Sequence, residues 1–371
     1  MMDIDWLARA VPQTSALHPY IPGKPVETLL REKGLDHAVK LASNENPYGP
    51  SPKAIAAIKK AATEVHRYPD GDATLLKTSL AAFHAVATDQ ILIGNGSNEV
   101  LELLIRTFAG PGDEVVYARR GFIVYALATQ AAGATCIAVP ESDGLTHDLD
   151  AMAAAVTDHT KIICIANPNN PTGTLHDNKA IQIFLDRLPR DVIVIVDEAY
   201  YEFVADRLGD SVQNLSHPGL VISRTFSKAY GLAGCRVGYA VANHTIIGLA
   251  NRFREPFNIN LPAQAAAVAA LDDREWVMDH VAKTIAERDR LETALQSMGM
   301  SGGHSFANFV LLHHSQSTAI LQGLENHGII PRPLAPYGMA DYLRISVGTA
   351  GENTEFLRIL ETIVPRGDET E

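Results

Sequence analysis

The sequence predicts an α/β protein with a large domain, in which helices cover a central and mostly parallel sheet, and a smaller α+β domain. Two observations predict this fold class. Between residues 89 and 243, short β-branched runs alternate with stretches of helical periodicity, as in sheets built from strand–helix–strand units. Beyond Pro262 the alternation gives way to one long helical pattern followed by short strand-like runs.

The larger part contains seven segments with the composition of buried strands. The expected strands are residues 90–93, 114–118, 135–139, 161–166, 192–196, 220–223 and 237–241. Polar sequences follow four of them: GNGSNEV after Ile93, NPNNPTG after Ala166, DEAYYEF after Val196 and RTFSKAYGLAGCRVG after Ser223. Ligands bind at the carboxyl ends of strands in such sheets, so we expect these four loops to form one site.

The remaining chain predicts an arm and a second domain. Residues 1–42 are irregular and rich in proline around HPYIPGKP, and we expect them to pack as an arm against the smaller domain. Residues 43–261 then form the large domain, and residues 262–371 the smaller one. In the smaller domain a helical pattern covers residues 263–299 and precedes strand-like runs at 308–313, 328–331 and 342–347.

Composition and charge exclude several classes of protein. The 371 residues are 46% hydrophobic and 20% charged, which is typical of a globular protein. Because 31 Lys+Arg stand against 43 Asp+Glu, the net charge of −12 disfavours binding to nucleic acid. No apolar run approaches the roughly 18 residues of a membrane span, and the first residues lack the positive charge of a signal peptide, so we expect no membrane contact and a cytoplasmic location. The 3 cysteines are widely spaced, which predicts buried neutral thiols and no metal site.

Lys228 and Asp197 are the first candidates for chemistry. Lys228, in TFSKAYGLAG, follows a strand and precedes Arg236 by eight residues. A lysine near a second cation is a candidate amine nucleophile, although most loop lysines are simply solvated. Asp197 ends the apolar run DVIVIVD, where a carboxylate is costly unless it meets a cation. Taken alone, Asp197 could equally cap the next helix.

Two loops carry groups that could bind an anionic cofactor. In GNGSNEV, Gly96, Ser97 and Asn98 open a helical pattern, so their backbone N–H groups could bind a phosphate, although a simple tight turn explains the glycines equally well. In ANPNNPTG, Asn170 lies in a turn that two prolines make rigid. A phosphate cradle, a carboxylate, a rigid amide and a lysine together describe a site for pyridoxal phosphate.

The order and spacing of these motifs resemble the fold-type I aminotransferases. NPNNPTG, DEAYYEF, SKAYGLAGCRVGY and YLRISVGT carry the resemblance, which covers nearly the whole chain. Within that family LASNENPYGPSP, HRYPDG, REPFNIN and PYGMADYLRISVGT resemble the histidinol-phosphate aminotransferase branch. The resemblance implies a pyridoxal phosphate-dependent transaminase that exchanges an amino group between histidinol phosphate or imidazole-acetol phosphate and 2-oxoglutarate or glutamate, in histidine biosynthesis.

The resemblance also implies roles for the cofactor residues. Lys228 would bind the cofactor covalently and move the substrate proton, and Asp197 would pair with the pyridinium nitrogen. Asn170 and Tyr200 would hydrogen-bond the phenolic oxygen, and Phe122 would stack on the ring unless it is a core residue. The residues implied for the cofactor phosphate are Gly96, Ser97, Asn98, Ser227 and Arg236, together with Tyr68 in HRYPDG.

Tyr68 and the substrate residues carry further expectations. In the resembling enzymes the residue matching Tyr68 reaches the cofactor phosphate of the neighbouring subunit, which implies a homodimer with shared sites. Arg344 would receive the substrate α-carboxylate as a two-pronged pair. The other residues implied for the substrate are Tyr20, Lys24, Asn46 and Arg332. The ordinary alternative for Lys24 and Arg332 is a surface residue with no role in binding.

Some alternatives stay open. In YARRGFIVY, Arg119 and Arg120 stand where many relatives have a proline-threonine pair, and this charge could favour anionic substrates or merely face solvent. The enzyme could be an aromatic amino acid aminotransferase of the same fold, or accept both kinds of substrate. A regulator that senses a ligand through such a domain would need a DNA-binding module, which neither the first 40 residues nor the net charge supplies.

Overall fold

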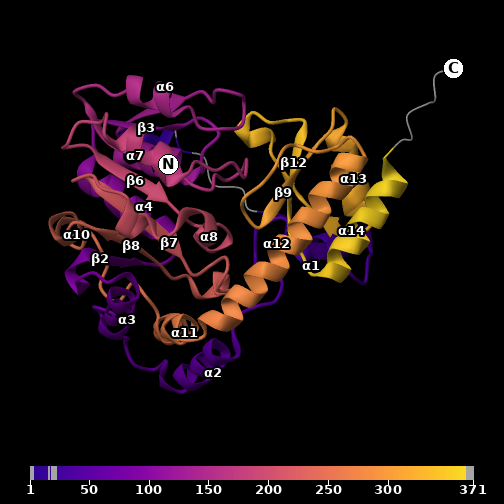
Figure 1. Ribbon diagram of the computed structural model, residues 1–371, viewed down its shortest axis with the longest axis horizontal. Helices are drawn as coiled ribbons and strands as arrows, with labels where there is room; N and C mark the ends of the chain where they lie inside the picture. The colour runs from indigo at the N-terminus through magenta and orange to yellow at the C-terminus, as the bar shows by residue number, and fades with distance from the viewer. Residues whose placement is uncertain (1–3, 16, 18–22, 365–371) are drawn as a thin grey trace.

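A seven-stranded sheet forms the centre of the larger part of the molecule (Figure 1). The computed structural model describes residues 4–15, 17 and 23–364. The strands, in sheet order, are β2 (Ile91–Gly94), β8 (Gly238–Ala242), β7 (Leu220–Thr225), β6 (Ile193–Asp197), β5 (Thr160–Ala166), β3 (Glu114–Ala118) and β4 (Thr135–Val139). Only β8 runs against its neighbours, so the predicted mostly parallel sheet is confirmed.

The central strands supply alternate side chains to two separate cores. Ile163 and Val194 pack on one side of the sheet, and Ile162 and Ile195 pack on the other. The first core is closed by α6 (Leu149–Ala154) and α7 (Asn178–Leu185), and the second by α4 (Ser97–Phe108), α5 (Val124–Ala132) and α10 (His244–Ala250). Because both faces are covered, these strands are apolar throughout rather than alternating in sequence.

The smaller part is built on a three-stranded antiparallel sheet. Its order is β11 (Arg332–Pro333), β12 (Tyr342–Ser346) and β9 (Phe309–His313). The predicted strand at 328–331 forms as β10 (Ile329–Ile330), which pairs with β1 (Val39–Lys40) of the N-terminal segment. The remaining helices of this part are α1 (Val26–Lys33), α13 (Ser317–Asn326) and α14 (Ala350–Ile363).

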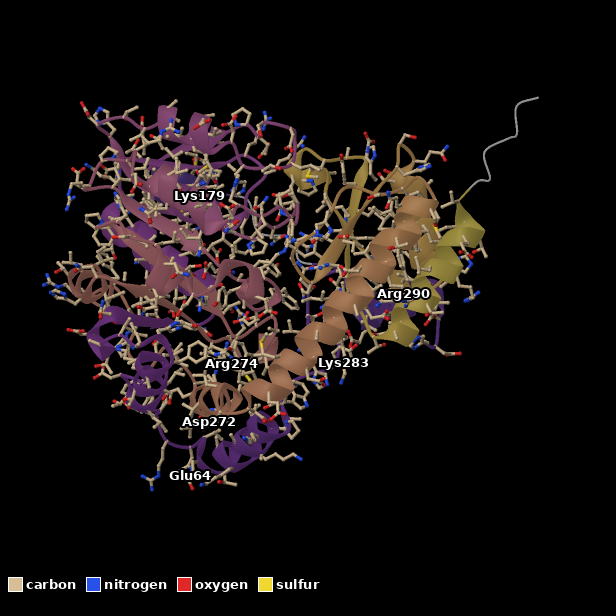
Figure 2. All side chains as sticks on the ribbon, in the orientation of Figure 1. Glu64, Lys179, Asp272, Arg274, Lys283 and Arg290 are labelled. Atoms are coloured by element: carbon tan, nitrogen blue, oxygen red, sulfur yellow. The ribbon has the colours of Figure 1, made fainter. Side chains whose placement is uncertain are left out.

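The single helical pattern predicted over 263–299 was wrong in one respect, because two helices form there. They are α11 (Leu261–Leu271) and α12 (Arg274–Ser297), and Figure 2 labels Asp272 at the break and Lys283 and Arg290 farther along α12. Aspartates compete with the helix backbone for hydrogen bonds, and Asp273 leaves the helical region with φ −112° and ψ 35°. From this break α12 runs obliquely toward the smaller sheet (Figure 1).

Four more helices belong to the larger part among the described residues. They are α2 (Pro52–Ala61), α3 (Thr74–His84), α8 (Ala205–Leu208) and α9 (Ser211–Asn214). Helix α11 packs against α2 and α3 and so belongs to the larger part. The next helix, α12, then takes the chain to the smaller part. The domain boundaries at residues 42 and 262 stay predictions.

Two expectations from composition can be compared with the structure. No helix among the described residues is long and apolar enough to cross a membrane. Cys164 is buried in β5 as expected, whereas Cys136 and Cys235 are only partly buried. Burial raises the pKa of all three thiols above the usual value, which keeps them neutral near pH 7.

Candidate active site

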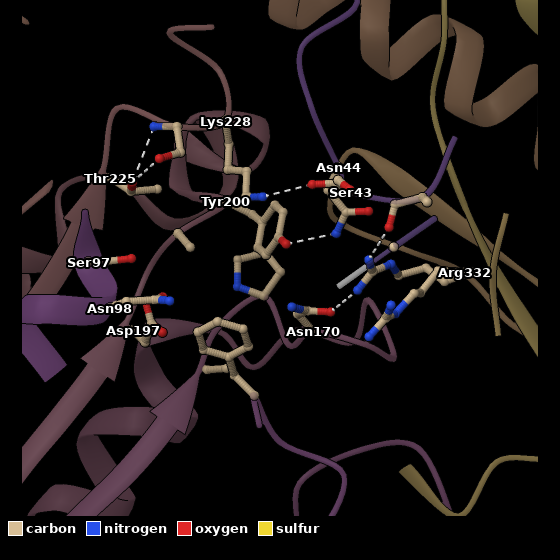
Figure 3. Close-up of a pocket in the computed structure, with 18 of the residues that line it drawn as sticks. Ser43, Asn44, Ser97, Asn98, Asn170, Asp197, Tyr200, Thr225, Lys228 and Arg332 are labelled. Carbon is tan, nitrogen blue, oxygen red and sulfur yellow. Dashed lines mark hydrogen bonds between the residues drawn. The ribbon is translucent and has the colours of Figure 1, made fainter. Parts of the chain in front are cut away.

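A pocket lies at the carboxyl ends of β5, β6 and β7, where they face the smaller sheet (Figure 3). Ala166, Asp197 and Thr225, each the last residue of its strand, line the pocket. The sequence-predicted site residues that line it are Ser97, Asn98, Phe122, Asn170, Asp197, Tyr200, Ser227, Lys228, Arg236, Arg332 and Arg344. The structure therefore brings eleven of the predicted residues to one cavity.

Lys228 presents its amine to this pocket. The Nζ atom donates to the carbonyl oxygen of Ser43 at 3.1 Å and lies 5.8 Å from the ring centroid of Tyr200. Burial of the amine lowers the pKa of Lys228 to about 7, and the positive charges of Arg344 and Arg236 act in the same direction. A substantial fraction of the amine is therefore unprotonated near neutral pH, as a nucleophile or a general base requires.

Asp197 is buried at the end of β6 and forms no ion pair among the described side chains, although the positive charge of Lys228 acts to lower its pKa. Its Oδ2 accepts a hydrogen bond from the Tyr125 hydroxyl at 2.9 Å, whereas its Oδ1 has no hydrogen-bond partner in the described part of the chain. Burial raises the pKa of Asp197 to about 6, and the bond from Tyr125 opposes this rise. The alternative of a helix cap does not apply, because the next helical turn, residues 201–203, has Tyr200 at its N-cap position.

The start of α4 forms an anion cradle with residues from two other loops. Gly96 has φ 83°, and a Cβ atom added there would lie 2.3 Å from Nη2 of Arg236, so only glycine lets this arginine approach. The other terminal nitrogen of Arg236, Nη1, donates to the Ser227 hydroxyl at 3.3 Å. The backbone N–H groups at Ser97 and Asn98, the Ser227 hydroxyl and the Arg236 guanidinium together fit a phosphate at a helix N-terminus.

Arg344 and Tyr200 lie on the side of the pocket toward the smaller sheet. Arg344 is 6% exposed, and its guanidinium donates to Asn170 Oδ1 and, at 2.8 Å, to the carbonyl oxygen of Ala42. The Tyr200 hydroxyl accepts a bond from Asn44 Nδ2 at 2.8 Å. Burial raises the pKa of Tyr200 to about 12, so its hydroxyl keeps its proton.

Arg332 lies beside Arg344. The two residues are directly paired in the antiparallel ladder of β11 and β12, and both line the pocket. The structure therefore places both arginines on neighbouring strands that line one cavity. Two guanidinium groups on adjacent strands can bind a dianion or two carboxylates.

Other predicted residues are not brought to the pocket. Lys24 forms ion pairs with Glu325 at 2.8 Å and Glu32 at 3.2 Å, which raise the pKa of its amine. Asn46 does not line the pocket, and its Nδ2 donates to the carbonyl oxygen of Ala229 at 2.8 Å. Tyr20 lies outside the described residues.

Tyr68 does not line the pocket of its own chain either. Its side chain is 82% exposed and stacks on Phe257, with ring centroids 4.6 Å apart. Phe257 and Val65 are exposed beside it. These residues form an apolar surface on the larger part of the molecule.

Sequence reasoning missed Asn44, the residue that positions Tyr200. Asn44 has φ 55°, and its backbone N–H donates to the Ser346 hydroxyl at 2.7 Å while its carbonyl oxygen accepts from Asn308 at 3.0 Å. The tolerance of asparagine for a left-handed backbone was the available signal, but two asparagines occur in LASNENP and only the fold separates their roles. No cluster of three or more potential metal ligands occurs among the described residues.

Comparisons with known proteins extend the resemblance. Residues 36–360 match the family described as Aminotransferase class I and II. A histidinol-phosphate aminotransferase of Methylobacillus flagellatus is 49% identical over 353 residues, covering 94% of this chain and 95% of that protein. Histidinol-phosphate aminotransferase 2 of Pseudomonas fluorescens strain Pf0-1 is 45% identical over 99% of this chain and 100% of its own length. The crystal structure of histidinol-phosphate aminotransferase from Sinorhizobium meliloti in complex with pyridoxal-5'-phosphate has a TM-score of 0.87 at 27% identity, covering 96% of this chain and 99% of that one.

Proposed function

Since this chain belongs to the class I and II aminotransferase family, we propose that it is a pyridoxal phosphate-dependent histidinol-phosphate aminotransferase. It exchanges an amino group between L-histidinol phosphate or imidazole-acetol phosphate and 2-oxoglutarate or L-glutamate. The observation that carries the proposal is the placement of two arginines, Arg332 and Arg344, across one pocket from Lys228 and Asp197.

The residues of the pocket fit pyridoxal phosphate. The buried Oδ1 of Asp197, which has no partner among the described residues, can accept a hydrogen bond from a protonated ring nitrogen. The cradle of Ser97, Ser227 and Arg236 suits the phosphate, and Phe122 lines the same cavity where it can cover one face of the ring. When bound, the cofactor supplies an electron sink for the carbanion that forms as the substrate loses its α-proton.

The chemistry of the chain itself centres on Lys228. Its Nζ would hold the cofactor covalently at rest, and as a free amine it would take the proton from Cα of the amino donor as a general base. A pKa of about 7 suits this task, because the amine can both accept and return the proton near neutral pH. Tyr200 and Asn170, which line the same pocket, would donate hydrogen bonds to the phenolic oxygen of the cofactor.

The two arginines fit the chemistry of both substrates. L-glutamate carries two carboxylates, whereas histidinol phosphate has no carboxylate and carries its negative charge on one phosphate. The adjacent guanidinium groups of Arg332 and Arg344 can bind either set of anionic oxygens, so one pocket serves both half-reactions in turn. An aromatic amino acid offers a single α-carboxylate and needs Arg344 alone.

Arg332→Ala tests this assignment. We expect kcat/KM for histidinol phosphate to fall at least about a hundredfold, because loss of one partner of a buried charge pair costs about 3–5 kcal/mol and each 1.4 kcal/mol is about tenfold. The rate with phenylalanine should stay within a few fold. The measurement is initial rates with 2-oxoglutarate and a panel of histidinol phosphate, phenylalanine, tyrosine and aspartate.

The outcomes of this panel separate the candidate functions. A wild-type preference for phenylalanine or tyrosine over histidinol phosphate would identify an aromatic amino acid aminotransferase instead. Equal losses for histidinol phosphate and phenylalanine in Arg332→Ala would mean that Arg332 supports the fold rather than binds the phosphate.

The active unit in this proposal is a homodimer with shared sites, located in the cytoplasm. The exposed stack of Tyr68 on Phe257 supports it, because a partner subunit would cover this apolar surface and receive the Tyr68 hydroxyl. Mixing Tyr68→Phe subunits with Lys228→Ala subunits should restore at most about half of the wild-type activity per dimer, since one composite site is then intact. Sedimentation of the active enzyme as a monomer would contradict the dimer.

A further inference from the structure

Two consecutive arginines precede Phe122, and their surroundings differ. The Arg119 side chain is exposed and has no side-chain partner among the described residues. The Arg120 side chain is only 22% exposed, and its guanidinium donates to the carbonyl oxygen of Gly144 and lies 3.9 Å from Glu141. Of the two alternatives left open by the sequence, Arg119 therefore faces solvent, whereas Arg120 is part of the structure around the pocket.

Glu141 fixes Arg120 in place. The Glu141 side chain is fully buried, and its Oε1 accepts a hydrogen bond from the backbone N–H of Arg120. Its Oε2 has no hydrogen-bond partner in the described part of the chain, and the Arg120 guanidinium is the cation beside it. A buried carboxylate needs such a cation, so the backbone and the side chain of Arg120 are held by one group.

Arg120 also joins the loops that form the larger part's side of the pocket. Its carbonyl oxygen accepts a bond from Asn169 Nδ2 at 3.0 Å. Asn169 immediately precedes Asn170, which accepts the bond from Arg344. Phe122 lies two residues after Arg120, so one arginine is linked to the loops that carry Phe122 and Asn170.

The same side chain reaches the smaller part. Arg120 Nη2 lies 3.5 Å from the carbonyl oxygen of Gly338, next to Tyr337, which lines the pocket. The bond to Gly144 adds a second link, because the adjacent Leu145 packs against Leu334 and Met339 of the smaller part. Arg120 thus contacts the turn at residues 335–338 directly and also supports the loop that packs beneath it.

These contacts lie at the rim of the pocket. A surface depression lined by Arg119, Phe122 and Tyr337, among others, shares Phe122 and Tyr337 with the pocket itself. Phe122 and Tyr337 therefore lie at the boundary between the pocket and this depression. Arg120 bridges the two segments that carry these side chains.

We propose that Arg120 is a positioning residue that holds the Tyr337 turn against the Phe122 loop and thereby sets the affinity of the pocket for its amino donor. The inference rests on the proposed function for the identity of that donor. Arg120 acts through Phe122, Asn170 and Tyr337 and itself contacts neither substrate nor cofactor. Its charge is matched by Glu141, so it works through geometry rather than by attracting the substrate.

Arg120→Ala in the holoenzyme tests the proposal, and Arg119→Ala is the matched control because it removes the same charge one residue away. We expect Arg120→Ala to raise KM for histidinol phosphate about tenfold or more, the size expected for loss of a charge-assisted hydrogen bond. The kcat value at saturation should stay within about threefold, and the absorption spectrum of the bound cofactor should not change. Arg119→Ala should leave KM within about twofold.

Two further variants keep the test decisive if Arg120→Ala folds poorly. Arg120→Lys keeps the charge but cannot reach three acceptors with one planar group, so its KM should lie between those of the wild type and the alanine variant. Glu141→Gln should also raise KM, and the Arg120→Ala/Glu141→Gln double variant should show less than the product of the two single effects.

Three results would overturn the proposal. They are an unchanged KM in Arg120→Ala and Arg120→Lys, an equal rise in Arg119→Ala, and a loss confined to kcat or thermal stability. Failure of the proposed function is seen separately, as a wild-type enzyme that prefers another amino donor. In that case the rise in KM is measured with the preferred donor.

Discussion

Two adjacent carboxylates at the end of β6 have opposite surroundings. Asp197 faces the pocket with one oxygen bonded to Tyr125 and the other without a partner among the described residues. Glu198 points to the other side, where its Oε2 accepts a bond from Arg224 Nε at 2.9 Å. Consecutive side chains of an extended segment point to opposite faces, so one strand end presents a carboxylate without an ion pair on one side and an ion-paired carboxylate on the other.

The paired side is a buried ionic cluster. Arg224 is 2% exposed, bonds Asp210 at 3.1 Å as well as Glu198, and lies 3.4 Å from the ring centroid of Tyr201. His84 joins this cluster, with its Nδ1 3.8 Å from Asp210. The comparison teaches that burial alone does not mark a functional carboxylate. Asp197 instead differs from Glu198 in lining the pocket and in forming no ion pair among the described side chains, whereas Glu198 is paired with Arg224.

The largest expected effect is on the pocket side, at Lys228. Lys228→Ala should bind pyridoxal phosphate but lose at least about a thousandfold in kcat, because a general base contributes about 10²–10⁴ and the covalent link is lost as well. Its stability should change little, since the Lys228 amine bonds only one carbonyl oxygen among the described residues. Single-turnover rates with glutamate and thermal unfolding check the two halves of this expectation. Ordinary turnover would exclude Lys228 from the reaction.

Next in size is a loss of stability on the paired side. Arg224→Met should lower the free energy of unfolding by about 3–5 kcal/mol, because it leaves Glu198 buried without its cation. The double variant Arg224→Met/Glu198→Gln should recover part of that loss. Denaturant unfolding measures both variants.

An exposed ion pair serves as the control for Arg224. Arg187 pairs with Asp150 on the surface, with side chains 46% and 85% exposed. Arg187→Met should cost about 0–1 kcal/mol, as is usual for exposed pairs. Equal losses in the two methionine variants would mean that burial of the Glu198–Arg224 pair does not matter.

The two sides also differ in how far the sequence could predict them. The strands of the seven-stranded sheet were predicted within about two residues, because a sheet covered on both faces requires continuous apolar runs. Asp197 was identified for the same reason, since it follows such a run. Arg224 was not, because its partners Glu198 and Asp210 lie in different segments and charged residues in loops have no pattern of their own.

Partners that come from distant parts of the chain were beyond prediction. Tyr125 lies 72 residues before Asp197, and Asn44 lies 156 residues before Tyr200. The break between α11 and α12 was missed because their residues share one helical pattern, which two aspartates interrupt only locally. Sequence reasoning thus found the residues that stand at strand ends but not the side chains that orient them.

A smaller effect is expected at Asp197 itself. Asp197→Asn should lower kcat about a hundredfold, since the neutral amide cannot stabilise a protonated ring nitrogen.

The pH dependence of stability provides a second measurement on Asp197. The pKa of Asp197 is raised from 3.8 to about 6 in the folded chain, so the folded state holds this proton more tightly than the unfolded state. Stability of the cofactor-free protein should therefore fall as the pH rises from about 4 to 6, and Asp197→Asn should remove this part of the fall.

The smallest effect is expected at Tyr125, the only described side chain that hydrogen-bonds Asp197. Tyr125→Phe removes the bond to Oδ2 but keeps the buried ring, which packs edge-on against Phe122 at 5.9 Å. The bond lowers the pKa of Asp197, so its loss should raise that pKa further and move the acid limb of the kcat/KM profile to higher pH. Near pH 8 the loss of rate should be less than about tenfold, since the carboxylate of Asp197 is still ionised at that pH and keeps its role.

Tyr201→Phe is the matched change on the paired side. The Tyr201 hydroxyl donates to the carbonyl oxygen of Gly209 at 3.0 Å, and its ring lies under Arg224. Loss of this neutral hydrogen bond should cost about 1 kcal/mol of stability and leave the pH profile of kcat/KM unchanged. If Tyr201→Phe moved the acid limb as far as Tyr125→Phe does, the two faces of the β6 end would be electrostatically coupled. The division between a face for chemistry and a face for stability would then be wrong, because a change beside Glu198 and Arg224 would reach Asp197.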